Sequence, residues 1–195
     1  SKALQLMEEG AIGTVHTVKS DFGFMLPFDQ HSRIYDKALG GGSLLDIGIY
    51  PALLSLFVFG RPDAEDVLAA ATFTRTEVDE SCAFTFRYPN NKLAIGHSTV
   101  AATTPVEAWL YGTEGTIYLH PRWHHSQKLT VSRYEGRQEI KHDIDLPYDG
   151  WGYSFEAAHV MQCLREQRLE SDLIPLDFTL DLAETLDVIR EKIGL

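Results

Sequence analysis

The chain has 195 residues, 44% of them hydrophobic and 23% charged, which is an ordinary globular mix that can bury a full core. Its 28 acidic and 17 basic residues give a net charge of −11, which argues against nucleic acid or anionic membranes as main partners. No apolar run approaches the roughly 18 residues that span a bilayer. Cys82 and Cys163 lie outside CxxC and CxxH spacings, and we expect reduced, buried thiols in a cytoplasmic protein.

The first expected elements are a short helix and a strand. Leu4 and Met7 recur at helical spacing, and Gly10 can end the helix. The chain lacks an initiator Met and starts within this helical pattern, so we expect it to be a piece of a longer protein. TVHTVKSDFGF, residues 14–24, alternates like a strand. Residues 26–41 predict a long loop, and such loops are usually functional or disordered.

An apolar segment with an internal proline comes next. Ser43 is expected to be its N-cap and Gly60 its C′ residue. Pro51 lacks a backbone donor and disfavours helix at the residue before it. We therefore predict an irregular first turn near Gly48, followed by a helix that runs to Phe59.

The next half of the chain is strand-like. Its segments are rich in β-branched and aromatic residues and are separated by turn sequences such as YPNNK and GTEGT. Short links imply antiparallel hairpins, because parallel crossovers need a dozen or more residues. The expected strands are VLAAATFTRT, SCAFTFRY, KLAIGHSTVAA, VEAWLYG, TIYLH, KLTVSRY and QEIKHDIDL.

The chain ends in two predicted helices with apolar stripes. In YSFEAAHVMQCLREQ the stripe contains Phe155, Ala158, Val160 and Leu164. The second helix is expected to have Asp177 as its N-cap and to end at Gly194. Its stripe contains Leu180, Ala183, Leu186, Ile189 and Ile193.

This order of elements predicts an α+β fold, with a mostly antiparallel, open-faced sheet and helices on one face. Aromatic residues fall on both sides of CAFTFRY and VEAWLYG. Since the helices are too few to cover both faces, we expect the open face to be buried against another subunit. The alternative is a half-exposed face with scattered apolar residues.

GGGSLLDIGIYP, residues 40–51, is the segment most suggestive of chemistry. On a helix, Asp46 and Tyr50 would share one side. A phenol can exchange a proton with an alkoxide if a nearby cation makes its anion accessible. On spacing alone, a packed tyrosine and an aspartate that caps the turn are the favoured explanation of the pattern.

Other catalytic patterns are not found. The sequence has no GxSxG, GxxxxGK[ST] or strand-linked GxGxxG, so no nucleotide-binding domain is visible within it. His120, His124 and His125 could suggest a metallohydrolase. Adjacent histidines in a strand point apart, however, and no CxxC or HxxxH supports zinc. We expect surface imidazoles and no metal site.

GGGSLLDIGIYP also resembles the signature at the start of the C-terminal domain of Gfo/Idh/MocA oxidoreductases. EEGAIGTVHTVKSDFG, LYGTEGTIYLHPRW and the two terminal helices agree with this family in the same order, over essentially all 195 residues. The tyrosine form is most similar to the branch of dimeric dihydrodiol dehydrogenases and NADP-dependent D-xylose dehydrogenases. The resemblance implies a C-terminal domain like that of glyceraldehyde-3-phosphate dehydrogenase.

The resemblance also implies a division of labour. Residues 1–195 would be the substrate-binding and dimerisation domain, while the Rossmann domain that binds NADP or NAD, with its catalytic lysine in an EKP motif, is absent from this chain. Tyr50 would be the proton donor or acceptor, and Asp46 would orient the phenol or the substrate. The whole protein would transfer a hydride between nicotinamide and a sugar, polyol or diol. The isolated chain would be inactive.

Further roles are implied by position. Phe22, Trp123 and Tyr148 match places where relatives line the substrate pocket, and plain packing is their alternative explanation. Gly40, Gly41 and Gly42 would allow close approach of the nicotinamide end. A homodimer through the open sheet face is implied as well. The alternative function is a non-catalytic, sheet-mediated dimerisation module or a carbohydrate-binding module.

Overall fold

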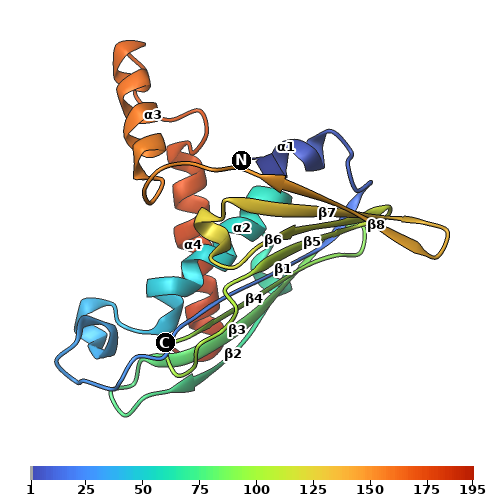
Figure 1. Cartoon of the computed structure of the whole chain (residues 1–195). Coiled ribbons are helices and arrows are strands. Elements are labelled where there is room, and N and C mark those ends of the chain that lie inside the picture. Colours follow the sequence, from blue (N-terminus) through green and yellow to red (C-terminus); the bar gives the residue numbers. More distant parts are fainter. Residues whose placement is uncertain (1) are drawn as a thin grey trace.

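The computed structural model describes residues 2–195, whose strands form one eight-stranded sheet with helices on one face (Figure 1). The predicted α+β class and the mostly antiparallel, open-faced sheet are confirmed. The strands are β1 (Val15–Gly23), β2 (Val67–Phe73), β3 (Asp79–Tyr88), β4 (Lys92–Thr99), β5 (Ala108–Gly112), β6 (Gly115–Leu119), β7 (Lys128–Glu135) and β8 (Gln138–Asp145). The α-helices are α1 (Lys2–Glu8), α2 (Ile49–Phe59), α3 (Tyr153–Arg165) and α4 (Leu176–Ile193).

The strand order is β2-β3-β4-β1-β5-β6-β7-β8. Antiparallel pairing of consecutive strands is confirmed for β2 to β4 and for β5 to β8. It is wrong for β4 and β5, because β1 lies between them, parallel to β4 and antiparallel to β5. Val18 of β1 pairs with Ala94 and with Leu110, and all three side chains are fully buried. The first strand therefore lies in the middle of the sheet and contributes to the core. Local turn signals could not reveal this position.

Helices α2 and α4 pack together on the closed face of the sheet. In α4, Leu186 and Ile189 are buried as expected, but Leu180 is exposed, so the predicted stripe is shifted by part of a turn. Leu182 and Thr185 complete the buried side instead.

The ends of α4 differ in how well the sequence predicts them. Its N-cap is Pro175 rather than Asp177, which lies within the first turn. A negatively charged side chain in the first turn still stabilises the helix through its interaction with the positive end of the helix dipole. At the other end, Gly194 adopts a left-handed conformation with φ 87°, as predicted.

Helix α2 is the apolar core helix. The surrounding stretch Lys37–Phe59 is long and apolar enough to cross a membrane by length and composition, which differs from the prediction that no segment is long enough. In the fold, 56% of its most apolar window is buried. It is also interrupted by short 3₁₀ and π segments, so it is best explained as a core element of this sheet.

The long loop before α2 is ordered rather than extended into solvent. It contains the 3₁₀ turns η1 (Arg33–Tyr35) and η2 (Lys37–Leu39). Tyr35 is almost fully buried, and its hydroxyl donates to the carbonyl of Leu26 at 2.7 Å. A second small core around Tyr35, Ile47, Val78 and Val100 thereby fixes the loop against the beginning of the α2 segment.

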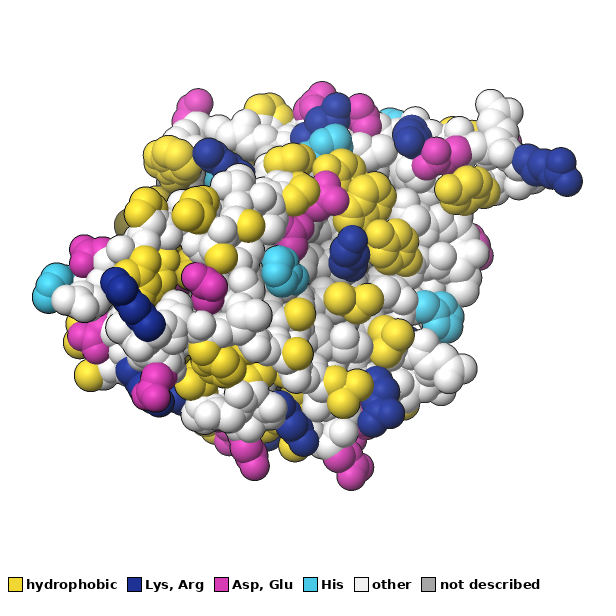
Figure 2. All heavy atoms as spheres, turned by 90° about the horizontal axis from the view of Figure 1, so that it is seen from below, with side chains coloured by type: hydrophobic (Ala, Val, Ile, Leu, Met, Phe, Trp, Pro, Cys, Tyr) yellow, Lys and Arg dark blue, Asp and Glu magenta, His cyan; other side chains and the backbone are white. Residues whose placement is uncertain are grey.

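The open face of the sheet carries aromatic and aliphatic side chains among polar ones (Figure 2). Trp109 stacks on Tyr118 with ring centroids 4.1 Å apart. In the strand register Lys19 is paired with Trp109 on one side and with Ile95 on the other. Lys19 therefore lies between Ile95 and the stacked rings. Ile95 and Leu68 remain 38% and 54% exposed.

Helix α3 extends away from the sheet (Figure 1). The predicted helix is confirmed, but its stripe is not buried: Phe155, Val160 and Leu164 are 61%, 52% and 70% exposed. Cys163 is the one residue buried within α3. Both cysteines of the chain, Cys82 and Cys163, are buried and free, as expected.

Candidate active site

The segment that carries Asp46 and Tyr50 changes backbone geometry twice. Residues Leu44–Gly48 form a π-helical turn, η3, which continues directly into α2 at Ile49. Pro51 follows this turn within α2, so its missing N–H falls where the helical hydrogen-bond pattern is already irregular. The predicted irregular turn near Gly48 and the helix to Phe59 are thus confirmed. π-Helical turns are frequent at functional sites.

A carboxylate from the sheet caps this segment. Asp79 accepts hydrogen bonds from the Leu44 amide at 2.7 Å and from the Ser43 hydroxyl at 2.8 Å. Ser43 occupies the predicted N-cap position, but its backbone is already helical and its hydroxyl donates to Asp79 instead of making a capping bond. Burial raises the pKa of Asp79, and the hydrogen bonds from Ser43 and Leu44 oppose this rise.

The glycine triplet packs mainly against the chain itself. A Cβ atom on Gly41 would lie 2.6 Å from the carbonyl oxygen of Ile34, and one on Gly42 would overlap the Asp79 carboxylate. Gly42 also has φ 109°, which a side chain would strain. Gly40 is exposed, with open space around it. Internal packing therefore accounts for glycine at positions 41 and 42, and contact with a nicotinamide remains a prediction for all three.

Tyr50 lies in an aromatic cluster built from three elements. Its ring centroid is 5.2 Å from that of Phe22 on β1 and 5.3 Å from that of His124 on the 3₁₀ turn η5 (Trp123–His125). Phe22 and His124 stack on each other at 4.7 Å and 16°. Tyr50 is 37% exposed. The cluster holds its ring while leaving part of it open to solvent.

The hydroxyl of Tyr50 is free to bind a ligand. Within residues 2–195, the tyrosine hydroxyls that donate to protein groups are those of Tyr35, Tyr88, Tyr118 and Tyr148. The Tyr50 hydroxyl is not among them. A partly exposed phenol without a protein partner can accept or donate a proton at a bound molecule.

Asp46 forms an ion pair with Arg33 from the loop turn η1. The Asp46 side chain is 17% exposed, whereas that of Arg33 is 57% exposed. Among the side-chain bonds of residues 2–195, Asp46 bonds to Arg33 rather than to Tyr50. The pair fastens the loop to the π-helical turn, so Asp46 acts on the position of this segment.

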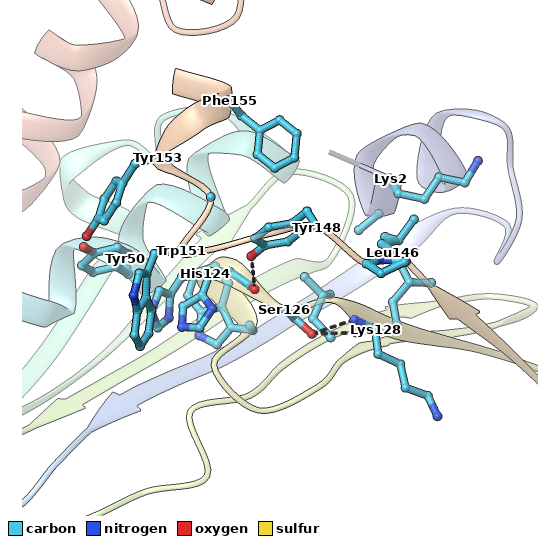
Figure 3. A pocket seen from close by; sticks show the side chains of 17 residues that line it. Lys2, Tyr50, His124, Ser126, Lys128, Leu146, Tyr148, Trp151, Tyr153 and Phe155 are labelled. Carbon is cyan, nitrogen blue, oxygen red and sulfur yellow. Dashed lines mark hydrogen bonds between the residues drawn. The ribbon is translucent and has the colours of Figure 1, made fainter. Parts of the chain in front are cut away.

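A hollow of about 990 Å³ opens beside Tyr50 (Figure 3). We call it the site hollow. Tyr50, His124 and Trp151 stand at one end of it, and Lys2 and Lys128 at the other. Its aromatic lining consists of Tyr50, Trp123, His124, His125, Tyr148, Trp151, Tyr153 and Phe155.

Two of these rings are fixed by hydrogen bonds. The Trp123 indole N–H donates to the carbonyl of Asp21 at 3.0 Å, which ties η5 to β1. The Tyr148 hydroxyl donates to the carbonyl of His125 (Figure 3). The walls are thus preorganised, and large aromatic surfaces suit the apolar face of a ring-shaped ligand.

The histidines around the site hollow do not form a metal site. Among residues 2–195, no group of three or more His, Cys, Asp or Glu side chains is placed to hold a metal ion. His120 bonds to the hydroxyl of Thr130 at 2.8 Å, away from the Tyr50 cluster. Burial lowers the pKa of His124 to about 4, assisted by His125 and Arg122.

Comparison with known proteins decides the family. A family model described as the GFO/IDH/MocA C-terminal domain matches residues 1–118. The chain belongs to the GFO/IDH/MocA family. It is 34% identical over 194 residues to trans-1,2-dihydrobenzene-1,2-diol dehydrogenase of Danio rerio, covering 98% of this chain and 57% of the relative. The enzyme of that name from Homo sapiens is 30% identical over 198 residues, covering 100% and 59%.

Solved structures of this GFO/IDH/MocA fold are similar as well. The aldose-aldose oxidoreductase of Caulobacter crescentus, complexed with glycerol, has a TM-score of 0.82 at 23% identity, covering 98% of this chain and 57% of that protein. A levoglucosan dehydrogenase in complex with NADH and levoglucosan has a TM-score of 0.79 at 18% identity, covering 98% and 60%. The GFO/IDH/MocA chain described here thus spans less than two thirds of the length of these relatives.

The structure brings together Tyr50 and the three substrate-binding residues that the GFO/IDH/MocA resemblance implied. Tyr50, Trp123 and Tyr148 line the site hollow, and Phe22 supports it from β1. Asp46 and the glycine triplet lie outside its lining. Their predicted roles at substrate and cofactor stay predictions.

Sequence reasoning missed two groups at this GFO/IDH/MocA site. His124 was expected on the surface, but it stacks on Phe22 and is half-buried. Trp151, 66% exposed at the mouth of the site hollow, was not singled out. The signal for Trp151 was the GWG sequence, since Gly150 and Gly152 both adopt positive φ and project the indole outward. Nothing local indicated His124, because its partner Phe22 lies far away in sequence.

Proposed function

We propose that this chain is the substrate-binding and dimerisation part of an NAD(P)-dependent oxidoreductase that acts on a hydroxyl group of a sugar, polyol or diol. The observation that carries this proposal is the Tyr50 hydroxyl, which is open to the site hollow and has no partner among residues 2–195. A proton carrier beside an aromatic pocket suits reversible oxidation of an alcohol.

Tyr50 would move the hydroxyl proton. In the oxidising direction, its phenolate accepts the proton from the substrate O–H as the C–H bond donates its hydride, and the carbonyl forms. NAD(P) supplies the hydride acceptor at the nicotinamide ring, because no amino-acid side chain lining the site hollow can accept a hydride. In the reducing direction, the neutral phenol returns the proton to the oxygen.

The phenolate needs a nearby cation, and His124 does not supply one. Its pKa of about 4 leaves the ring beside Tyr50 uncharged at neutral pH. A lysine from the rest of the protein fits this requirement, in accord with the resemblance to relatives that carry it in an EKP motif. The exposed apolar side chains of α3 next to the site hollow support a nucleotide-binding domain that covers this side.

A Tyr50→Phe variant of the full-length protein tests this proposal. Removing the hydroxyl should lower kcat for oxidation of alcohols about 10²- to 10⁴-fold, since that is the usual contribution of a positioned acid or base. Tyr134→Phe is the matched control, because Tyr134 is 61% exposed at the far end of β7. NAD(P)H absorbance with a panel of aldoses and vicinal diols measures the rates.

Two results would contradict this proposal. A Tyr50→Phe variant with full rate would exclude the proton-carrier role. Turnover by the isolated 195-residue chain would contradict the need for a separate nucleotide-binding domain. Sugar binding by a full-length protein that never turns over would favour the non-catalytic carbohydrate-binding module.

The open sheet face supports the proposed homodimer. Its exposed Leu68 and Ile95 lie in one row across the strands with the stacked Trp109 and Tyr118, alternating with Thr85 and Lys19, and a second copy could cover this row. Ile95→Lys should convert dimers to monomers in sedimentation experiments while leaving the melting temperature of the monomer nearly unchanged. Leu39→Lys, in the loop before α2 and 60% exposed, is the control. Dimers that persist in Ile95→Lys would exclude this face.

A further inference from the structure

His124 is the polar ring of the site hollow to which the proposed chemistry assigns no task. It stacks on Phe22 at 4.7 Å and 16°, so its ring plane is fixed. Its centroid lies 5.3 Å from that of Tyr50, and both residues line the site hollow (Figure 3). A second hydrogen-bonding group therefore stands next to the proton carrier.

The two nitrogens of His124 have different surroundings. Nδ1 is buried and has no hydrogen-bond partner within residues 2–195. Nε2 has no partner in that range either, but it is not among the buried atoms and so remains accessible. A buried N–H without an acceptor is rarer in proteins than a buried acceptor without a donor. The proton is therefore assigned to Nε2, which makes this atom a donor that is available to a ligand.

We propose that His124 donates from Nε2 to a hydroxyl oxygen on the carbon next to the one at which Tyr50 acts, so that the site hollow selects vicinal diols. This inference rests on the proposed function of Tyr50. Two unpartnered groups on neighbouring rings match two oxygens on neighbouring carbons. A ligand with a single hydroxyl would leave one of them unpaired.

The charge state of His124 fits a neutral substrate. The titratable groups that face it are Tyr50, His125, whose ring centroid is 4.6 Å away, and Arg122. Burial holds the pKa of His124 low, and His125 and Arg122 add to this effect. At neutral pH, His124 offers a hydrogen bond without a charge. Such a group recognises a hydroxyl, whereas a carboxylate or phosphate would favour a charged partner.

Paired substrates test the proposal on the full-length protein. The pairs are trans-cyclohexane-1,2-diol with cyclohexanol, and D-glucose with 2-deoxy-D-glucose. His124→Phe keeps a ring to stack on Phe22 but removes both nitrogens. It should reduce the preference for the diol member of at least one pair, measured as a ratio of kcat/KM values, by about 3- to 10-fold.

Two variants separate this role from a structural one. His124→Gln places an amide donor near the Nε2 position and should restore most of the preference. Tyr50→Phe should lower the rate on both members of a pair alike and leave their ratio unchanged. His142→Gln, an exposed histidine on β8, controls for loss of an imidazole elsewhere. An unchanged ratio in His124→Phe would overturn the proposal.

A binding measurement keeps this test independent of catalysis. Trp123 and Trp151 line the site hollow, so their fluorescence should report ligand binding even if no substrate turns over. Absence of turnover would contradict the proposed function but not the hydroxyl contact of His124. Weaker binding of the diol by His124→Phe than by wild type would still support the hydroxyl contact. Equal binding, or no binding of either diol by wild type, would overturn it.

Discussion

Helices α3 and α4 follow each other in the chain and both have an amphipathic pattern, yet the apolar side of α4 is buried and that of α3 is exposed. In α4, Ile189 is fully buried and Leu186 is 6% exposed against the sheet and α2. In α3, Leu164 and Val160 remain 70% and 52% exposed, and the helix extends from the body (Figure 1). An apolar stripe thus indicates that a helix needs a partner, but not that the partner belongs to the same domain.

Hydrogen exchange should show the largest difference between the two helices. Amides of α3 should exchange through local opening at a small fraction of the global unfolding free energy, because few buried contacts hold this helix. Amides of α4 should approach the global value. Mass spectrometry of the isolated chain measures both, and a full-length protein should protect α3 further. Equal protection of both helices in the isolated chain would contradict this comparison.

Truncation of one apolar side chain in each helix should give the next largest difference. Ile189→Ala should lower the free energy of unfolding by about 2 to 5 kcal/mol, since it leaves a cavity in the core. Leu164→Ala should change it by less than about 0.5 kcal/mol in the isolated chain. Urea denaturation followed by circular dichroism measures both. A loss of more than 1 kcal/mol in Leu164→Ala would show that α3 is packed in solution.

Asp79 fastens the α2 segment to the sheet, and no equivalent tie to the sheet is found for α3 among residues 2–195. Asp79→Ala should cost about 1 to 3 kcal/mol, because the Leu44 amide and the Ser43 hydroxyl lose their acceptor. The comparison with Asp79→Asn isolates the charge. Both variants can be measured by urea denaturation.

The pH dependence follows from the raised pKa of Asp79. A carboxyl whose pKa is higher in the folded state stabilises the fold fully below its ordinary value of 3.8, and this contribution is lost as pH rises through the folded pKa. The stability of wild type relative to Asp79→Asn should therefore be greater at pH 4 than at pH 7. A difference that increases toward pH 7 would contradict burial as the main cause.

The smallest effect is expected from the surface ion pairs of α4. Arg61 bonds to Asp181 at 3.3 Å and also to Glu184, with all three side chains about half exposed. Arg61→Ala should cost less than about 1 kcal/mol, and the loss should shrink in 1 M salt. Arg165→Ala on α3 is the matched control. A salt-independent loss would indicate lost packing rather than lost charge.

Much of the fold was predictable because its signals are local. Hairpin turns, the helix ends at Gly60 and Gly194, and the irregular turn before Pro51 follow from the conformations that glycine and proline allow or forbid. The candidate site was predicted only in part, and from resemblance. Tyr50 and Trp123 do meet at the site hollow. Asp46 pairs with Arg33 instead, which the sequence could not reveal because the two lie on separate turns.

The sequence by itself determined which segments become helices and strands and that the sheet is open on one face, since period and composition are properties of neighbouring residues. Only the tertiary structure decided that β1 enters the sheet between β4 and β5, that Asp79 caps the π-helical turn, and that His124 stands beside Tyr50. Each of these depends on which distant surfaces bury most apolar area together, and that is a property of the whole chain.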